Sequence, residues 1–240
     1  MRNPTVPVSF LLLAGVVLTG CVRGGAVPNG APSTFDPNPP VSPVTGPAPP
    51  SPVPSPPPPP APLPPLAIPV NLDDNHPVGT PYWPDGDTET GAHGETVGQY
   101  ECFPNDPPET YHVHSHLSIF LDGAGLAVPK NIGIVKLNST TTCYYTLHTH
   151  DRSGKLHIEA AAPAMFTLGD LFRIWGEPLE PDNVAGLTGK PIVIYITDQN
   201  GVVTLATGDW HDIELLSHRE ITIQVGTPLA EIPNFTWTAH

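Results

Sequence analysis

Basic residues are scarce in this chain. Its 240 residues include nine Lys and Arg against 23 Asp and Glu, which gives a formal net charge of −14 at pH 7. Proteins that bind nucleic acid, or that adhere to anionic lipid through basic patches, depend on clustered Lys and Arg. The composition therefore excludes nucleic acid as a partner and argues against membrane attachment through basic side chains.

Motifs of several common enzyme classes are also absent. The sequence contains no Walker loop, no dinucleotide-binding glycine pattern and no HExxH helix. Ser, His and Asp are plentiful, so a hydrolase triad stays open, but no nucleophile elbow marks one. Only two methionines occur, and one of them is Met1, which argues against a Met-rich Cu(I) carrier.

The N-terminus resembles the signal of bacterial lipoproteins. A positive charge at Arg2 precedes an uncharged run, residues 6–18, that is too short to span a bilayer. The run ends in Leu18-Thr19-Gly20-Cys21, the pattern in which the cysteine is lipidated and becomes the first residue of the mature chain. For residues 1–21 the resemblance implies export and a lipid anchor at Cys21 in the cell envelope, on the periplasmic or cell-surface side.

Composition divides the rest of the chain into three parts. Residues 22–71 are dominated by proline, with an unbroken run from Pro56 to Pro60. Such a segment lacks backbone donors and apolar bulk, so we expect a disordered linker, extended as polyproline II, without a packed core. Residues 72–98 are predicted to be a loose acidic lead-in, and residues 99–240 are long enough for one domain with a sizeable core.

Cysteine usage favours one disulfide. Lipidation of Cys21 would leave only Cys102 and Cys143. Disulfides persist in exported proteins, so we expect a bridge that closes a loop of about 40 residues. Because both cysteines are close in sequence to histidines, thiolate ligation of a metal is the alternative.

Histidines form the densest pattern in the chain. Six of the eleven lie between residues 112 and 157. Alternate side chains of a strand share one face, so this spacing gathers the histidines on single faces of neighbouring strands. Imidazole is the commonest metal-ligating side chain, and converging neutral imidazoles are otherwise poorly satisfied. The predicted metal ligands are His112, His114, His116, His148, His150 and His157.

A predicted turn sets the pairing of the later histidines. Asp151-Arg152-Ser153-Gly154 is expected to be a four-residue turn, and Lys155 to Glu159 the returning strand. This register places His148 directly opposite His157, with Cβ atoms about 4.5–5.5 Å apart. The three alternate histidines of the first strand span roughly 13 Å, so one metal cannot easily bind all three. We expect a neighbouring pair from that strand and one or two ligands from the hairpin.

Strand-like patterns dominate residues 99–240. Thr167 is a good N-cap for the one clear helix, which shows an apolar stripe from Leu168 to Trp175 and ends at Gly176. The predicted fold class is a β-rich α+β domain with one antiparallel or mixed sheet, and a β-sandwich or barrel is the alternative. The expected strands lie at 111–121, within 127–137, and at 140–150, 155–159, 191–197, 202–205 and 220–225.

The pair His112-Val113-His114, in an exported chain with a nearby disulfide candidate, resembles the copper strand of Cu,Zn and copper-only superoxide dismutases. In that family a His-x-His pair binds copper, further histidines complete the site, and an internal disulfide anchors a loop. The resemblance implies that His112 and His114 bind copper. It also implies that His148, His150 or His157 completes the site, and no motif decides among these three.

Copper is the expected metal and zinc the alternative. Imidazole ligands suit Zn, Cu, Fe and Ni, and copper binds most tightly in the divalent series. A superoxide-binding site on so acidic a chain would need local positive charge, for which Arg152 and Lys155 are the candidate anion-steering residues.

Three functions remain open at this stage. The first is a copper-dependent superoxide dismutase anchored in the envelope. The second is a non-catalytic module that binds or delivers copper or zinc. The third is a structural subunit of a cell-envelope assembly, with other envelope proteins as partners. A coordination position open to a small-molecule substrate would favour the enzyme, and a closed tetrahedral site would favour a structural metal.

Overall fold

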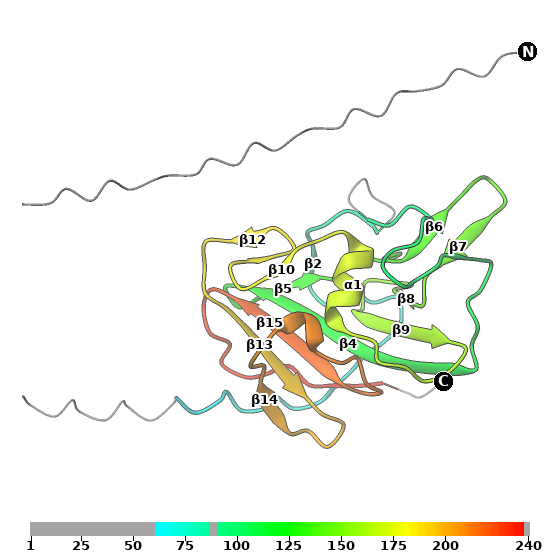
Figure 1. Ribbon diagram of the computed structural model, residues 1–240. Helices are drawn as coiled ribbons and strands as arrows, with labels where there is room; N and C mark the ends of the chain where they lie inside the picture. The colour runs from blue at the N-terminus through cyan, green and yellow to red at the C-terminus, as the bar shows by residue number, and fades with distance from the viewer. Residues whose placement is uncertain (1–60, 87–90, 238–240) are drawn as a thin grey trace, which may run out of the picture. The chain divides into compact units, whose positions relative to one another are not determined.

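The computed structural model describes residues 61–86 and 91–237. The predicted lipoprotein signal, with Cys21, lies outside the described residues. Within them the chain forms a β-rich α+β domain with a mixed sheet and one α-helix, which confirms the predicted fold class (Figure 1). No helix in the described ranges combines the length and the apolar character needed to cross a bilayer.

Strand β4 (Tyr111–Leu121) is the centre of the main sheet. Its second half pairs in parallel with β15 (Glu220–Val225) along one edge. Along the other edge, its first half pairs antiparallel with β9 (Lys155–Ala160), and its last residues pair with β5 (Ala124–Ala127). Asp122 and Gly123 join β4 to β5 with positive φ angles of 50° and 84°, as the predicted tight turn requires.

Four further strands extend this sheet on both sides. Next to β15 lie β13 (Ile192–Thr197) and then β14 (Val203–Leu205). At the other side β2 (Thr80–Pro81) pairs with β5, and β8 (Leu147–His148) pairs with β9. The sheet is mixed: β4 pairs in parallel with β15 and β2 in parallel with β5, whereas its other pairs are antiparallel.

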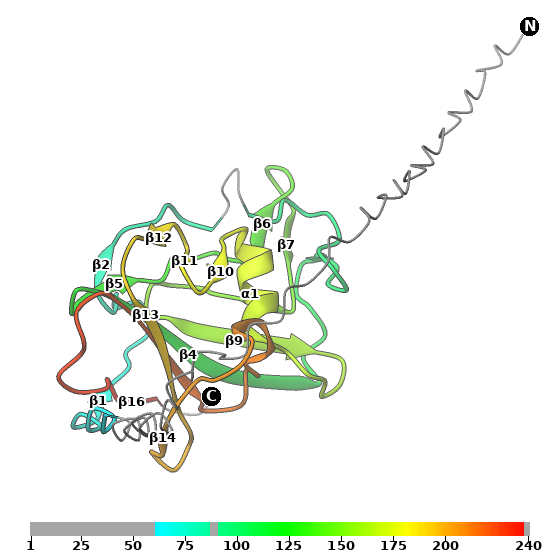
Figure 2. The same cartoon turned by 60° about the vertical axis from the view of Figure 1, so that its left-hand side comes forward.

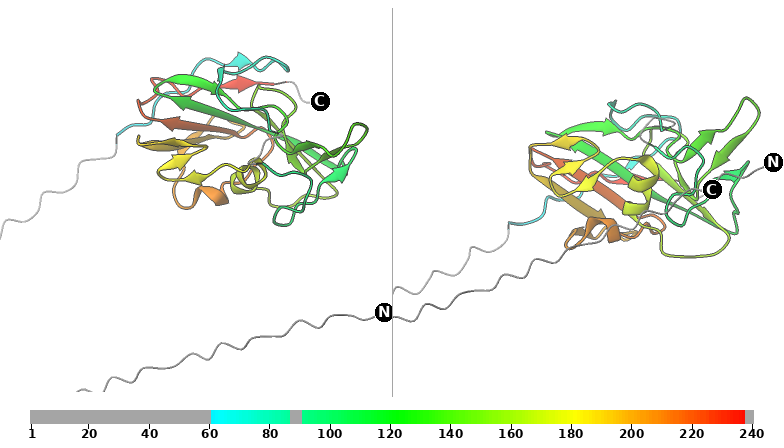
Figure 3. Two further views of the ribbon diagram at one scale, coloured as in Figure 1. Left: turned by 90° about the horizontal axis from the view of Figure 1, so that it is seen from above. Right: turned by 45° about the horizontal axis from the view of Figure 1, so that its top comes forward.

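The two faces of β4 differ in polarity. Leu117 and Ile119 point to the face that is buried in the hydrophobic core, whereas the histidines occupy the alternate positions. The helix α1 (Leu168–Trp175) covers the apolar face (Figure 2). Strands β1 (Val70–Asn71) and β16 (Phe235–Thr236) lie on the opposite side of the sheet (Figure 3). The sheet is therefore covered on both sides: helix α1 lies on its apolar face, and the two-stranded ribbon of β1 and β16 lies on the other.

The helix begins and ends as the sequence predicts. The Thr167 side chain accepts a hydrogen bond from the Asp170 backbone N–H, and the Asp170 carboxylate accepts one from the Thr167 N–H, which completes a capping box. Gly176 ends the helix with φ 79°. The buried face consists of Leu168, Gly169, Leu171, Phe172, Ile174 and Trp175.

The strand expected over residues 140–150 is interrupted. Its first part, β7 (Thr142–Tyr144), belongs to a separate three-stranded sheet with β3 (Phe103–Pro104) and β6 (Ile134–Lys136). Its second part is β8 in the main sheet. Tyr145 is fully buried between the two parts, and its N–H donates to Gly133 rather than to a ladder partner. Alternation alone could not reveal this change of sheet.

Cys102 and Cys143 form a disulfide, which confirms the predicted pairing. Cys102 directly precedes β3, and Cys143 lies in β7. The cysteines are separated by 41 residues in sequence, and the loop that their bridge closes contains β4. The alternative in which both cysteines are metal ligands is therefore not the arrangement found.

Two smaller features lie around the sheet. A three-stranded meander follows the helix, with β10 (Leu179–Glu180), β11 (Asn183–Val184) and β12 (Leu187–Thr188). A 3₁₀ turn, η1 (Trp210–Asp212), packs beside α1, where Gly169 leaves room for the backbone of η1.

The segments before residue 99 also take part in packing. Trp83, in the predicted lead-in, is buried, and its Nε1–H donates to the Ala185 carbonyl at 2.8 Å while its ring meets that of Trp175 at 5.3 Å. Within the predicted linker, Leu66 forms a bridge with Ile232. The described end of the linker thus contacts the C-terminal segment of the domain.

Candidate metal centre

Three adjacent strands bring histidines into one row. The β4–β9 register pairs His114 with His157, and the β8–β9 register pairs His148 with His157. The second pairing is the one predicted from the four-residue turn and is confirmed. His112 lies opposite Glu159, one step further along the same face. Backbone pairing alone therefore places these five side chains side by side.

The first group consists of His112, His114 and His157. The Nε2 atom of His114 lies 3.1 Å from Nε2 of His112 and 3.1 Å from Nδ1 of His157. Two nitrogen ligands of a tetrahedral metal with bonds of about 2.0–2.1 Å are about 3.3 Å apart. The ring nitrogens of the first group are thus already close to the spacing that one metal ion needs.

The second group consists of His148, His150, His157 and Glu159, whose ligand atoms all lie within 4.8 Å of one another. Nε2 of His148 is 3.2 Å from Nε2 of His150. Oε1 of Glu159 is 3.6 Å from Nε2 of His148 and 3.5 Å from Nδ1 of His157. This donor set of imidazoles and one carboxylate suits a transition metal.

The candidate ligands form two overlapping groups in the described part of the chain, and His157 is the member common to both. Each residue contributes one ligand atom, so a single ion would be bound by one group or the other. Substitution of His157 affects both groups at once and is therefore the most decisive change at this site.

Glu159 is a candidate ligand that the pattern of histidines did not identify. Its side chain is only 7% exposed, and Oε1 also lies 3.3 Å from Nε2 of His112. The same oxygen lies within 3.6 Å of three imidazole nitrogens, and a metal ion bound among them would supply the positive charge that a buried carboxylate needs. The signal in the sequence was the two-residue spacing from His157, which places both side chains on one face of the returning strand.

Burial holds two of the imidazoles in the neutral form. Burial lowers the pKa of His148 to about 3, against the opposing effect of the Glu159 charge. Burial, with smaller contributions from His150 and His112, lowers the pKa of His157 to about 3. Metal binding requires deprotonated ligands, so these residues do not have to lose a proton near pH 7.

A backbone contact fixes the tautomer of His148. Its Nδ1 lies 2.9 Å from the carbonyl oxygen of Tyr145. A carbonyl only accepts, so Nδ1 carries the proton and donates it, and Nε2 presents a lone pair toward His150 and Glu159. Outer hydrogen bonds of this kind orient the histidine ligands of metal sites.

His116, the third alternate histidine of β4, lies in neither group. It is fully buried, its Nε2–H donates to the Ser153 carbonyl at 2.8 Å, and the Phe235 ring covers it at 4.5 Å. Burial lowers its pKa to about 4. Its hydrogen bond to Ser153 and its contact with Phe235 engage the imidazole outside both groups, although His116 is only two residues from His114 on the same face of β4.

The candidate anion-steering cations both have acidic partners. Arg152 donates to Asp85 at 2.8 Å, and the buried Lys155 ammonium pairs with Asp74. Their charges are balanced locally, so the structure does not bring a free positive charge to the site through these two residues. The site is nevertheless open to solvent on one side, where His112 and His150 are exposed.

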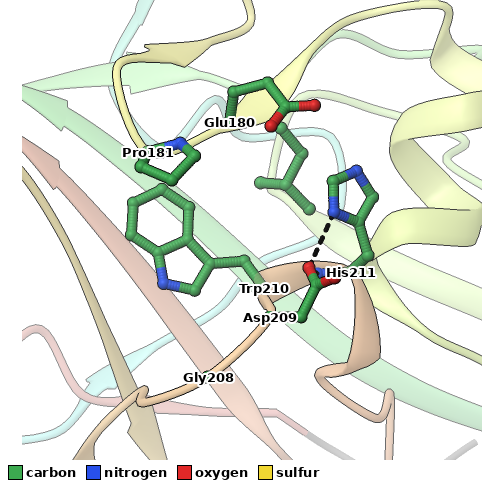
Figure 4. Close-up of a pocket in the computed structure, with 7 residues that line it drawn as sticks. Glu180, Pro181, Gly208, Asp209, Trp210 and His211 are labelled. Atoms are coloured by element: carbon green, nitrogen blue, oxygen red, sulfur yellow. Dashed lines mark hydrogen bonds and ion pairs between the residues drawn. The ribbon is translucent and has the colours of Figure 1, made fainter. Parts of the chain in front are cut away.

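A separate pocket does not contain these ligands. It has a volume of about 550 Å³ beside η1 and is lined by Glu180, Asp209, Trp210 and His211, among others (Figure 4). The His211 Nδ1–H donates to the Asp209 carboxylate at 2.9 Å, across the pocket from Glu180. His211 therefore has its own partner and takes no part in either histidine group.

His218 also lies outside both histidine groups. The backbone N–H of His218 donates to the His114 carbonyl at 2.8 Å, and its exposed ring stacks on Trp237. His218 thus supports the end of β4 through its backbone and is in neither group. No family model, curated protein or solved structure matches this chain, so the geometry of its own side chains identifies the β4–β8–β9 site as a candidate transition-metal centre.

Proposed function

We propose that this chain is an exported, lipid-anchored protein whose domain binds a transition metal, copper in the first place, at the β4–β8–β9 site. The observation that carries the proposal is the spacing of the ring nitrogens. Neighbouring nitrogens in both groups are 3.1–3.2 Å apart before any metal is considered. Imidazoles without a metal gain little from such crowding, since each pair shares at most one proton.

The donor set favours copper over the other candidates. It combines imidazoles with one carboxylate and contains no thiolate, because Cys102 and Cys143 are joined to each other. Among divalent ions of the first transition row, copper binds such nitrogen and oxygen donors most tightly. Zinc uses the same ligand types and remains the alternative metal.

The predicted anchor suggests where the domain works. A signal that ends in Leu18-Thr19-Gly20-Cys21 supports lipidation at Cys21 and export. A proline-rich spacer extends by about 3.1 Å per residue, so residues 22–60, the part of the predicted linker before the segment that contacts the domain, would hold the domain up to about 120 Å from the lipid. Metal buffering or delivery at the cell envelope fits a site held at such a distance from the membrane.

Superoxide dismutation is the second candidate function. The open side of the site at His112 and His150 favours it, since a small molecule could reach a bound metal there. Bound copper would supply the one-electron chemistry by alternating between Cu(II) and Cu(I). The local balance of Arg152 and Lys155 by Asp85 and Asp74 weighs against it, because the chain then offers less attraction to an anion. We therefore place metal binding first.

A copper titration of the purified metal-free protein tests the proposal. We expect the wild type to bind at least one Cu(II) per chain, with nitrogen hyperfine structure in its electron paramagnetic resonance spectrum. His157→Ala should lose this binding, because His157 belongs to both groups. His93→Ala is the matched control, since His93 is exposed and belongs to neither group, and it should bind as the wild type does.

The same samples separate the two candidate functions. Full occupancy with no acceleration of superoxide decay would support binding or delivery, whereas acceleration that disappears in His157→Ala would support the enzyme. If the wild type binds no metal, or if His157→Ala and His93→Ala bind with equal affinity, the β4–β8–β9 site is not a metal centre.

A further inference from the structure

One nitrogen atom lies at the junction of the two histidine groups. Nδ1 of His157 is 3.1 Å from Nε2 of His114, a member of the first group, and 3.5 Å from Oε1 of Glu159, a member of the second. This nitrogen has a single lone pair, so it binds one metal ion at a time. An ion on Nδ1 of His157 can therefore complete its coordination on either side, with the rest of the first group or with the rest of the second.

Glu159 provides a further link between the two groups. Its Oε1 lies 3.3 Å from Nε2 of His112 in the first group and 3.6 Å from Nε2 of His148 in the second. Both separations are close to the spacing of about 3.3 Å between two ligands of one tetrahedral ion. The negative charge of this carboxylate therefore stays beside an ion in either group.

The two groups differ in the number of donors and in burial. The second group offers four donors, and the side chains of His148 and Glu159 are only 1% and 7% exposed. The first group offers three imidazoles and has no buried member, and the side chain of His112 is 33% exposed. A buried carboxylate attracts a cation strongly because its surroundings screen the charge weakly. The second group is therefore the holding position for an ion, and the first group is the exit position.

We propose, on the basis of the metal binding proposed above, that the site is a relay that passes its ion from the holding position to the exit position and then to an acceptor with metal ligands of its own. The bonds to Nε2 of His148 and of His150 break, and these nitrogens keep their lone pairs. Bonds to Nε2 of His112 and of His114 form in their place, and the bond to Nδ1 of His157 is kept throughout.

This step is an exchange of ligands, and the oxidation state of the ion does not change. The ion keeps protein ligands at every stage, so the step avoids the complete loss of ligands that direct release from the holding position requires. The acceptor meets the ion at His112, the exposed member of the exit position. The relay thus gives the delivery function a route through named side chains.

Transfer of copper to a chelator tests the relay. The metal-free protein is loaded with one equivalent of Cu(II) and mixed with excess EDTA, and stopped-flow absorption follows the loss of copper from the protein. His112→Ala should slow the transfer at least about ten-fold, because it removes a ligand of the exit position alone. His148→Ala should accelerate it at least about ten-fold, because it removes a ligand of the holding position alone. His93→Ala, an exposed histidine outside both groups, should transfer copper as the wild type does.

The opposite signs separate a relay from a structural effect. A variant that loosens the domain, or that removes one ligand from a single undivided site, would release copper faster in both cases. Circular dichroism checks that each variant is folded. If His112→Ala does not fold, His114→Gln removes another ligand of the exit position and should also slow the transfer.

The outcomes that overturn the relay are distinct from failure of the proposed metal site. If folded His112→Ala transfers copper as fast as the wild type or faster, the ion leaves directly, past the exposed His150, and there is no relay. If His148→Ala binds no copper, the first group cannot hold the ion, and the relay is refuted as well. In both cases the wild type still binds copper, whereas a wild type that binds none refutes the metal site itself.

Discussion

Removal of the Cys102–Cys143 disulfide is expected to destabilise the domain by about 4 kcal/mol and to leave metal binding unchanged. The bridge closes a loop with a sequence separation of 41. In the chain-entropy model the lost freedom of the unfolded state for a loop of this size is worth about 4 kcal/mol at 25 °C. For a domain of this size, each kcal/mol shifts Tm by about 2–4 °C, so the melting temperature should fall by about 8–16 °C.

Two ways of opening the bridge separate its effects. Chemical reduction of the metal-free wild type keeps both sulfur atoms in place, whereas the double variant Cys102→Ala, Cys143→Ala also removes the buried sulfur of Cys143. The double variant should therefore be somewhat less stable than the reduced wild type, because it also loses the packing contacts of the buried Cys143 sulfur. Urea unfolding measures both differences on the same scale.

The result that would refute this reasoning is specific. If mass spectrometry shows two free thiols but the reduced protein unfolds within about 1 kcal/mol of the oxidised one, the loop does not constrain the unfolded chain as the model requires. If the double variant loses copper binding although it is folded, the sulfur atoms take part in the metal site after all. If the copper affinity of the double variant is within three-fold of that of the wild type, the result would support a site formed by the two histidine groups without the cysteines.

Three further predictions concern backbone strain, pH and the anchor. Gly154→Ala should lower the free energy of unfolding by more than about 3 kcal/mol, because φ is 85° and a Cβ would lie 2.2 Å from the Leu117 carbonyl oxygen. Gly123→Ala, with φ 84° and open space around the Cβ, should lower it by only about 1–2 kcal/mol. Urea unfolding measures both values. Burial raises the pKa of Glu220 from 4.5 to about 7. The contribution of Glu220 to stability is therefore complete below pH 4.5 and is lost as the pH rises through 7, which lowers the free energy of unfolding by about 3 kcal/mol. A Glu220→Gln variant whose stability falls as steeply over this range would contradict this prediction. Cys21→Ser should release the protein from the membrane fraction, and a variant that stays anchored after its signal is removed would show that Cys21 is not lipidated.

Local patterns predicted much of the site because the site depends on short-range pairing. The predicted register of His148 opposite His157 is confirmed, although β8 ends at His148 and residues 149–154 connect it to β9 in place of the predicted four-residue turn. Thr167 and Gly176 likewise mark the ends of the helix through contacts within one turn. The disulfide could be predicted because only two cysteines remain after Cys21.

Other features depend on residues far apart in the chain. The parallel pairing of β4 with β15 joins positions more than 100 residues apart, and no local pattern indicates it. The separation of His116 from the metal groups depends on a hydrogen bond to Ser153 and on cover by Phe235, which is near the C-terminus. Glu159 was missed as a candidate ligand because a lone carboxylate at the end of a strand usually faces water, and only the register opposite His112 shows that it lies among the histidines.

The pairing of β9 between β4 and β8 couples the candidate metal centre to correct folding. Leu156 and Ile158 face the core, whereas His157 and Glu159 face the site. A slip of β9 by one residue would turn every one of these side chains to the opposite face. In misregistered molecules the candidate ligands would face away from the site and the apolar side chains away from the core. The fraction of chains that bind metal should therefore equal the fraction with the native strand alignment. If the proposed site binds metal, its uptake would therefore be a quantitative probe of folding fidelity in preparations of this protein.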